Sequence, residues 1–192
     1  MSRIIAGTRK GHRLQTPPGD RTRPTTDRVR EALFSVIASW AGTAGSPSEE
    51  SLAGLAFLDL YAGSGAVGLE AASRGASPVL LVESDRRTAR IIADNARTLK
   101  LEVQVRTGRV DDVIAQPPPG PYDVIFADPP YEVDSAALSR TLATLLESGW
   151  INDEALVIVE RSSRTEDLSW PEDPADVWAR PYGETTLHFW QR

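Results

Sequence analysis

Four consecutive residues, Asp128-Pro129-Pro130-Tyr131, combine the side chains and the backbone restraint that could bind an exocyclic amine. They follow a short apolar run, which the pattern predicts to be a buried strand. Proline cannot continue a strand ladder, so Pro129 and Pro130 mark the end of the strand and stiffen the turn. The carboxylate of Asp128 and the carbonyl oxygen of Pro129 can accept the amine hydrogens, while the ring of Tyr131 stacks on a planar base. A proline-containing loop with a capping acid is the simpler interpretation, so other parts of the chain must decide.

A glycine-rich loop supplies a second candidate site. Residues 63–68 have the spacing G-x-G-x-x-G between a predicted strand and a predicted helix, and Glu83 ends the next predicted strand, twenty residues after Gly63. Glycines at this spacing permit a tight turn and close approach of the backbone to a ligand, and the acid can accept both hydroxyls of a ribose. The loop therefore predicts a nucleotide site.

Two ligands fit this spacing. A dinucleotide would make the protein an oxidoreductase, and S-adenosylmethionine would make it a methyltransferase. Asp59 lies within the strand, four residues before Gly63, and a carboxylate buried there needs a hydrogen-bond donor. The ammonium of the methionine moiety supplies a donor, whereas a pyrophosphate would be repelled. Asp59, together with the amine-binding acid Asp128, favours S-adenosylmethionine.

The composition is that of a globular domain, with 41% hydrophobic and 25% charged residues in a chain of 192. The absence of cysteine excludes disulfides and thiolate zinc sites, and with two histidines no metal site is expected. No apolar run approaches the roughly 20 residues of a membrane span, and the basic N-terminus lacks the apolar segment of a signal peptide. We therefore expect a cytoplasmic protein without membrane contact. Nothing in the sequence specifies an oligomer, and a monomer is the expectation.

The charge is distributed unevenly along the chain. The net charge is −6, but residues 1–30 contain eight basic and two acidic residues, so that this segment carries +6 and the remainder −12. A basic segment on an acidic protein predicts a polyanionic partner at that end. Two glycines bound a turn at 7–11, which indicates a β-hairpin with Arg9, Lys10 and Arg13 at or beside its tip.

Strands and helices alternate from residue 55 onward, which predicts an α/β fold with a mostly parallel sheet covered on both faces and a closing antiparallel hairpin. The expected strands are 56–60, 78–83, 103–105, 124–127, 155–160, 177–180 and 185–190, and the expected helices are 66–74, 86–99, 110–115 and 134–147. Three segments are expected: 1–25 as a basic hairpin and loop, 26–54 as a helix and linker, and 55–192 as the main domain.

These motifs resemble a known family. Residues 128–131 match the Asp/Asn-Pro-Pro-Phe/Tyr motif of amino-methyltransferases, and residues 59–65 match their cofactor motif. The runs 3–7, 23–34, 68–76 and 182–185 are similar to bacterial enzymes of the RsmD type, the 16S ribosomal RNA guanine-N2 methyltransferases. The resemblance implies a Rossmann-like class I methyltransferase with a seven-stranded sheet, S-adenosyl-L-methionine as cofactor, and ribosomal RNA or the assembling small ribosomal subunit as partner.

The resemblance also implies roles for particular residues. The implied catalytic residues are Asp128, Pro129, Pro130 and Tyr131. The implied cofactor-binding residues are Asp59, Tyr61, Ala62, Gly63, Ser64, Gly65, Glu83, Ser84 and Asp128. The implied RNA-binding residues are Arg3, Arg9, Lys10, Arg13, Arg23 and Arg28.

One position departs from the family pattern. Many relatives carry an aspartate after the third strand, facing the adenine amine of the cofactor, whereas Gly108 or Arg109 occupies that place here. We expect the backbone or a neighbouring residue to contact the adenine instead, and Asp111 and Asp112 are not assigned to that role.

Three alternatives remain open at this point. An adenine-N6 methyltransferase acting on DNA or RNA would use the same amine-binding motif. An NAD-dependent oxidoreductase would use the glycine loop alone. A non-catalytic RNA-binding or ribosome-assembly protein would keep the cofactor site as a relic.

Overall fold

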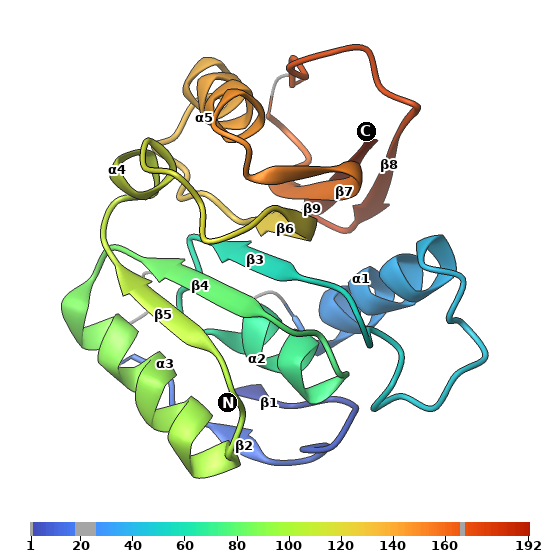
Figure 1. Cartoon of the computed structure of the whole chain (residues 1–192), viewed down its shortest axis with the longest axis vertical. Coiled ribbons are helices and arrows are strands. Elements are labelled where there is room, and N and C mark those ends of the chain that lie inside the picture. The colour runs from blue at the N-terminus through green and yellow to red at the C-terminus, as the bar shows by residue number, and fades with distance from the viewer. Residues whose placement is uncertain (1, 18–25, 166–167) are drawn as a thin grey trace.

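A seven-stranded sheet forms the centre of the computed structural model, which describes residues 2–17, 26–165 and 168–192 (Figure 1). The strand order is β5-β4-β3-β6-β7-β9-β8. Strands β5, β4, β3, β6 and β7 run parallel, β9 pairs antiparallel with β7, and β8 pairs antiparallel with β9 at the edge of the sheet. This is the mostly parallel sheet with a closing hairpin that the sequence predicts.

The elements have the following bounds. The strands of the sheet are β3 (Phe57–Leu60), β4 (Val79–Glu83), β5 (Gln104–Thr107), β6 (Tyr122–Ala127), β7 (Ile151–Ser162), β8 (Asp176–Tyr182) and β9 (Thr185–Gln191). The helices are α1 (Asp27–Trp40), α2 (Ala66–Ser73), α3 (Arg86–Leu99), α4 (Val110–Ile114) and α5 (Ser135–Glu147). The N-terminal hairpin consists of β1 (Ser2–Arg3) and β2 (Arg13–Leu14).

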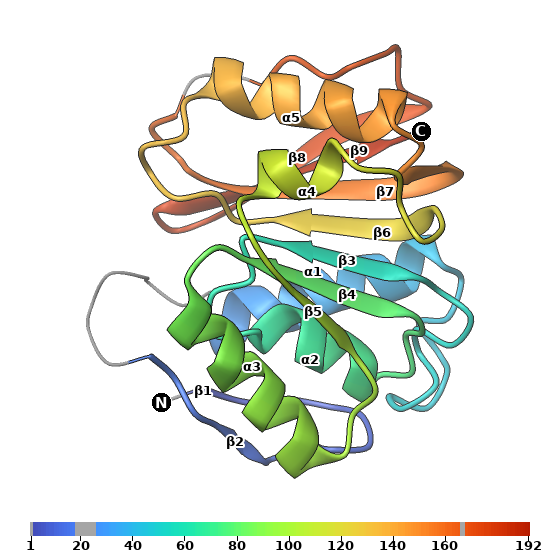
Figure 2. The same cartoon turned by 60° about the vertical axis from the view of Figure 1, so that its left-hand side comes forward.

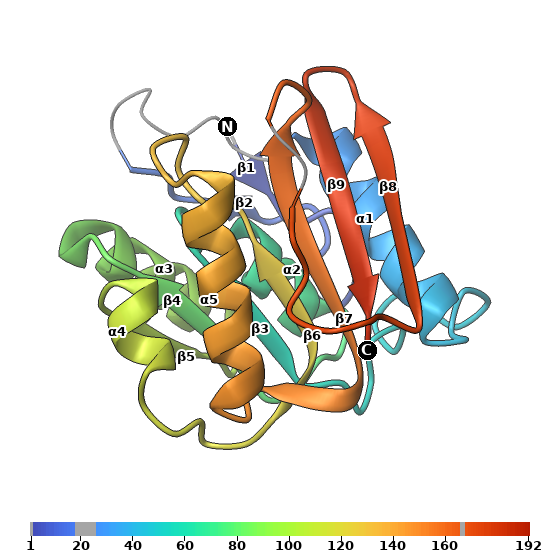
Figure 3. The ribbon, with the colours of Figure 1, turned by 90° about the horizontal axis from the view of Figure 1, so that it is seen from above.

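Alternating side chains of the strands divide the core into two layers. Leu58 and Ile125 face α4 and α5, while Phe57 and Phe126 face α1, α2 and α3. Figures 2 and 3 show these helices on opposite faces of the sheet, with α1 beside β8 and β9. Because α1 shares a core with the sheet, it forms part of the main domain's packing. Among the described residues, no helix has the length and apolar character needed to cross a membrane.

The basic hairpin packs on α2 and α3. Ile4 and Leu14 form a small core with Leu69, Ala96 and Leu99. The tip lies against the end of α2 because Thr8 N–H donates to the carbonyl oxygen of Ser73 at 2.8 Å. Gly7, at φ +81°, is required for this close approach, since a Cβ there would lie 1.9 Å from that same oxygen. The hairpin is therefore a folded part of the domain.

A buried carboxylate holds the hairpin in place. Glu70 of α2 accepts backbone N–H groups of Ile5 and Ala6 at 2.7 and 2.9 Å, and the Nε of Arg74 at 2.9 Å. Arg30 of α1 approaches the same carboxylate at 4.0 Å and also donates to the carbonyl oxygen of Arg3. Arg30, one of the eight cations of the basic N-terminal segment, is fully buried and serves structure, so it is not available to a polyanion.

This cluster yields a stability prediction. Glu70→Gln leaves the buried guanidinium of Arg74 without its counter-charge and leaves Arg30 with Asp27 alone, so we expect the free energy of unfolding to fall by about 3–5 kcal/mol. Urea denaturation measures the loss. Glu31→Gln, which changes an exposed acid on α1, should alter stability by less than about 0.5 kcal/mol. Equal stability of the two variants would contradict the role assigned to Glu70.

Candidate active site

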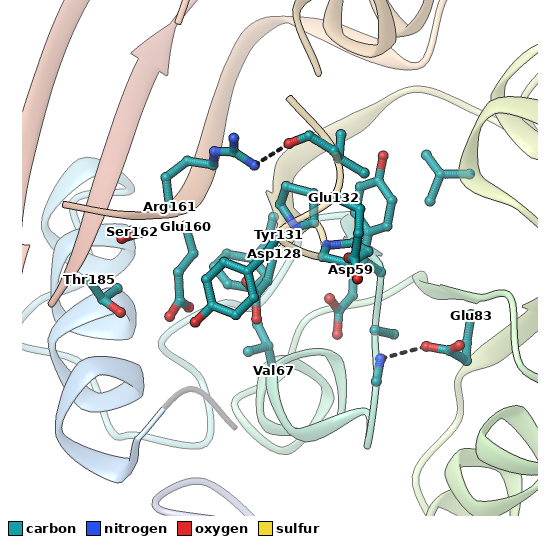
Figure 4. A pocket seen from close by; sticks show the side chains of 18 of the residues that line it. Asp59, Val67, Glu83, Asp128, Tyr131, Glu132, Glu160, Arg161, Ser162 and Thr185 are labelled. Carbon is teal, nitrogen blue, oxygen red and sulfur yellow. Dashed lines mark hydrogen bonds between the residues drawn. The ribbon is translucent and has the colours of Figure 1, made fainter. Parts of the chain in front are cut away.

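A cleft with a volume of about 1530 Å³ lies at the carboxyl ends of the parallel strands (Figure 4). It lies where β3 continues to β4 on one side and neighbours β6 on the other, which is the topological switch point at which open α/β sheets bind ligands. The volume exceeds the roughly 300–1,000 Å³ of typical small-molecule pockets, so the cleft can hold a cofactor together with a second group. Of the expected site residues, the cleft is lined by Asp59, Tyr61, Ala62, Gly63, Ser64, Glu83, Ser84, Asp128, Pro129, Pro130 and Tyr131.

The glycine loop forms the tight turn expected between β3 and α2. Gly63 and Gly65 have positive φ angles of 53° and 76°, and Gly65 N–H donates to the carbonyl oxygen of Ala62 at 2.7 Å. Gly65 does not line the cleft: a Cβ there would lie 2.9 Å from Ile92, and its expected cofactor contact remains a prediction. Gly68 is needed because a Cβ would lie 2.6 Å from Leu81. The first glycine therefore lines the site, while the other two permit close packing beneath it.

Glu83 at the end of β4 holds this turn. Its Oε2 accepts the N–H of Gly63 at 2.8 Å, and its Oε1 accepts the N–H of Asp85 at 2.8 Å. Oε2 retains a second lone pair and Oε1 has only a long second contact, with the hydroxyl of Ser84 at 3.4 Å, so Glu83 can also accept hydroxyl groups of a ribose. The acid thus links the glycine turn to the start of α3.

Asp59 is buried in β3 below the turn. The N–H of Gly68 donates to its Oδ2 at 2.8 Å, so one donor for this carboxylate comes from α2 rather than from a ligand. Burial raises the pKa of Asp59 to about 7, with a smaller opposing effect from the Gly68 hydrogen bond. A cationic ligand would favour the ionised form, so the carboxylate suits the ammonium of S-adenosylmethionine.

Asp128 enters the same cleft from the neighbouring strand. Asp59 pairs with Phe126 and Leu60 with Ala127 in the parallel register, which places Asp128 directly beyond the end of β3. Burial, and then the negative charges of Glu160 and Asp59, hold the pKa of Asp128 well above its ordinary range. The register therefore brings the two motifs predicted from sequence to one cleft.

Tyr131 supplies the aromatic surface at the rim. Its side chain is 78% exposed and is one of two exposed large hydrophobic side chains among the described residues, whereas Pro129, two residues earlier, is buried. An exposed ring held by a rigid turn at the cleft is suited to stacking on a base.

Sequence reasoning missed two residues of β7. Glu160 and Arg161 are 8% and 7% exposed and both line the cleft. The Nη1 of Arg161 donates to the carbonyl oxygen of Val133 at 2.8 Å, which ties β7 to the rim loop. Figure 4 shows Glu160, Asp128, Asp59 and Glu83 in that order across the cleft. The sequence does contain a signal, because Glu160 and Arg161 follow an apolar run typical of a buried strand. The signal places them near Asp128 only when it is known that β7 lies beside β6 in the sheet.

The departure at Gly108 and Arg109 leaves a different set of groups near β5. Arg109, Val110 and Asp111 line the cleft, and Asp111 accepts the hydroxyl of Thr141 at 3.1 Å. The expected contact of the adenine with the backbone or with a neighbouring residue remains a prediction.

The predicted RNA-binding residues are not gathered at the cleft. Arg9 donates from its Nε to the carbonyl oxygen of Leu99 at the end of α3, so it and Lys10 lie at the far ends of α2 and α3 from the cleft. Arg3 forms an ion pair with Asp27 at 3.3 Å, whereas Arg13 and Arg28 are exposed. Arg23 falls outside the described residues. The RNA contacts of these residues remain predictions.

The fold and the cleft together define a class I methyltransferase. A search of solved structures finds a putative methyltransferase from Escherichia coli, 34% identical, with a TM-score of 0.83, covering 99% of this chain and 97% of that one. The family model described as Conserved hypothetical protein 95 matches residues 2–191. The ribosomal RNA small subunit methyltransferase D of E. coli strain K12 is 38% identical over 159 residues, which are 82% of this chain and 73% of the relative. The chain belongs to this RsmD family.

A more distant structure shares the fold. It is described as a 16S rRNA N2 methyltransferase from T. thermophilus in complex with AdoMet and guanosine, with 20% identity, a TM-score of 0.67, and coverage of 92% of this chain and 46% of that one. The expectation of S-adenosylmethionine as cofactor agrees with these comparisons. Membership of a methyltransferase family decides against the NAD-dependent oxidoreductase considered from the glycine loop.

The raised pKa of Asp59 yields a pH prediction. We propose that the ammonium of S-adenosylmethionine binds the ionised carboxylate of Asp59, so the affinity for the cofactor should weaken about tenfold per pH unit as the pH falls below about 7. In Asp59→Asn the amide oxygen still accepts the Gly68 N–H, but the amide releases no proton when the cofactor binds. The slope of log Kd against pH should therefore be smaller by about one than in the wild type. Calorimetry between pH 5.5 and 8 measures both slopes. An identical pH dependence in the variant would contradict the ionisation assigned to Asp59.

Proposed function

We propose that this protein transfers a methyl group from S-adenosylmethionine to the exocyclic N2 of a guanine in 16S ribosomal RNA. The observation that carries the proposal is that Asp128 and Tyr131 open onto the same cleft as Asp59, Gly63 and Glu83. Bound S-adenosylmethionine supplies an electrophilic methyl group on its sulfonium. The similarity to the ribosomal RNA small subunit methyltransferases supports ribosomal RNA as the substrate.

The rim residues would position and activate the amine. Its lone pair is delocalised into the base, which makes the nitrogen a poor nucleophile. Asp128 and the carbonyl oxygen of Pro129 accept its hydrogens and so favour the pyramidal, reactive geometry. Asp128 has a raised pKa, which also suits it to take up the proton that the nitrogen loses on methylation. Tyr131 stacks on the base, which must leave its helix or loop to enter the cleft.

The pair of carboxylates at the rim favours guanine over adenine. The edge of guanine presents the N1–H next to the N2 amine, so two neighbouring groups donate. Adenine presents the N6 amine next to an unprotonated N1, which a second carboxylate would repel. Asp128 and Glu160 line the cleft on adjacent strands, and the charge of Glu160 raises the pKa of Asp128. Two acceptors close enough to interact match the guanine edge.

Removal of the rim acid tests the catalytic assignment. Asp128→Ala should reduce single-turnover methyl transfer to small ribosomal subunits by about 10²–10³-fold, because the charged acceptor acts chiefly in the transition state. Affinity for S-adenosylmethionine should stay within a few-fold. Asp112→Ala changes an exposed acid of α4 that does not line the cleft, and it should behave as wild type. Normal turnover by Asp128→Ala would remove this residue from the mechanism.

Nucleoside analysis of the methylated RNA tests the choice of base. The wild-type product should be N2-methylguanosine, and N6-methyladenosine would transfer the assignment to the adenine alternative. Glu160→Gln should lower kcat/KM for guanine by about 10–100-fold, since each well-placed base contact contributes about 1–3 kcal/mol of discrimination. An unchanged kcat/KM in this variant would show that Glu160 does not contact the base. No methyl transfer to any RNA would favour the non-catalytic RNA-binding alternative.

A further inference from the structure

A row of arginines runs along the exposed face of α3. Arg86, Arg90 and Arg97, here called the arginine ridge, are all exposed. Their spacing of four and seven residues places them within about 40° of one another around a helix with 3.6 residues per turn. The opposite face of α3 contributes Ile92 and Ala96 to the core. The ridge is therefore a regular cationic surface on a helix whose other face is fixed by packing.

Helix stability explains Arg97, which lies in the last turn of α3 and pairs with Asp94 at 3.0 Å, but it does not explain Arg86 and Arg90. Arg86 and Arg87 occupy the first turn of α3, which contains no acidic residue. A cation there faces the positive end of the helix dipole, which is unfavourable, although Asp85 caps the helix through Thr88 N–H at 2.8 Å. Within the described part of the chain, neither Arg86 nor Arg90 forms an ion pair. Residues that break a local stability rule without a compensating contact are expected at functional surfaces.

The N-terminal hairpin extends the ridge at its far end. Asn95 exchanges two hydrogen bonds with the backbone of Gln15, both of 2.9 Å, and Arg9 donates to the carbonyl oxygen of Leu99. Figures 1 and 2 show the hairpin lying alongside α3. These contacts bring Lys10 and Arg13 to the C-terminal end of the helix that carries the ridge. Asn95 lies on the face of α3 opposite the ridge, so the hairpin adds positive charge beyond the C-terminal end of the helix and does not share the face of the ridge.

The ridge starts at the cleft. Glu83 and Ser84 line the cleft, and Arg86 follows two residues later at the start of α3. The helix has 14 residues, so the surface extends about 20 Å from the cleft to the hairpin tip. This length accounts for the distance between the cleft and Arg9 and Lys10, because the ridge bridges the gap.

The distribution of charge selects this side for a polyanion. Residues 1–110 contain 16 basic and 11 acidic residues, a net charge of +5, whereas residues 111–192 contain 5 and 16, a net charge of −11. The other side of the cleft is lined by the acids Glu132, Asp134, Glu160 and Glu184, which outnumber the cations Arg161 and Arg164 there. A phosphate backbone would be repelled there and attracted to α3.

We propose that the arginine ridge, continued by Lys10 and Arg13 of the hairpin, binds the phosphates of the RNA strand that flanks the target nucleotide. This inference rests on the proposed function, because it takes the nucleic acid to be the substrate whose base enters the cleft. The ridge positions the RNA through its backbone and reads no sequence. It extends the RNA contact from the rim at Tyr131 across the cofactor side of the cleft to the hairpin.

The test compares two double variants, in each of which two arginines are replaced by glutamine. Arg86→Gln/Arg90→Gln removes two ridge cations and breaks no ion pair between residues that the structure describes. Arg140→Gln/Arg180→Gln removes two exposed cations from α5 and β8 and changes the net charge by the same amount. The substrate is a fragment of 16S ribosomal RNA, and binding is measured by fluorescence anisotropy from 50 to 300 mM salt.

The ridge variant should bind RNA about 10-fold more weakly than wild type at 150 mM salt. The slope of log Kd against log salt concentration should decrease by about two, because each lost phosphate contact lowers this slope by about one. Its melting temperature and its affinity for S-adenosylmethionine should not fall, and kcat at saturating RNA should be unchanged while KM rises. The control pair should bind within twofold of wild type. An unchanged salt dependence in the ridge variant, or an equal loss of RNA affinity in the control variant, would contradict the role proposed for the ridge.

This design separates the ridge from the proposed reaction. If the wild-type protein methylates no guanine, but the ridge variant still shows a smaller salt dependence of RNA binding than wild type, the ridge is supported and the proposed reaction is wrong. Normal guanine methylation with an unchanged slope would overturn the ridge alone.

Discussion

The parallel pairing of β3 with β6 is the constraint on which the site depends. The two strands are far apart in sequence, yet their register pairs Asp59 of β3 with Phe126 of the neighbouring β6. This pairing brings Asp128, two residues after Phe126, to the same cleft as Asp59. A shift of one residue in this register would turn the side chains of β6 to the opposite face of the sheet. It would also separate the acid from the cofactor turn. The buried residues on both faces of β3 and β6 fix this register, so the hydrophobic core determines the geometry of the chemistry.

The cleft concentrates negative charge in a way that favours a cationic ligand. Asp59 and Glu160 are buried and Asp128 is partly buried, and burial together with neighbouring negative charges raises the pKa of Asp59 and of Asp128. A sulfonium and an ammonium group would relieve this repulsion, and the product of methyl transfer lacks the sulfonium charge. The electrostatics of the cleft would therefore hold the substrate cofactor more strongly than its product. The same concentration of acids would keep RNA phosphates out of the cleft and leave the base as the part that enters.

Local patterns in the sequence predicted the elements that carry the two motifs. The strand and turn at 56–65 and the strand ending at Glu83 were confirmed because their signals, apolar runs ended by glycine or acid, lie within a few residues. The strand expected at 155–160 extends over Ile151–Ser162, since pairing with Tyr122 at one end and with β9 at the other prolongs it. Glu160 was missed because its role depends on which strand lies beside it. The burial of Arg30 and the position of the hairpin tip depend likewise on tertiary contacts that no local pattern records.

A crystal structure with S-adenosylhomocysteine and guanosine would test the central claim most directly. The account predicts that the amine nitrogen of guanosine lies within hydrogen-bond distance of Asp128 and faces the sulfur across a gap of about 3–4 Å, the space of one methyl group. It also predicts that Glu83 contacts the ribose of the cofactor. A sulfur atom directed away from Asp128, or a guanosine bound outside the cleft, would contradict it.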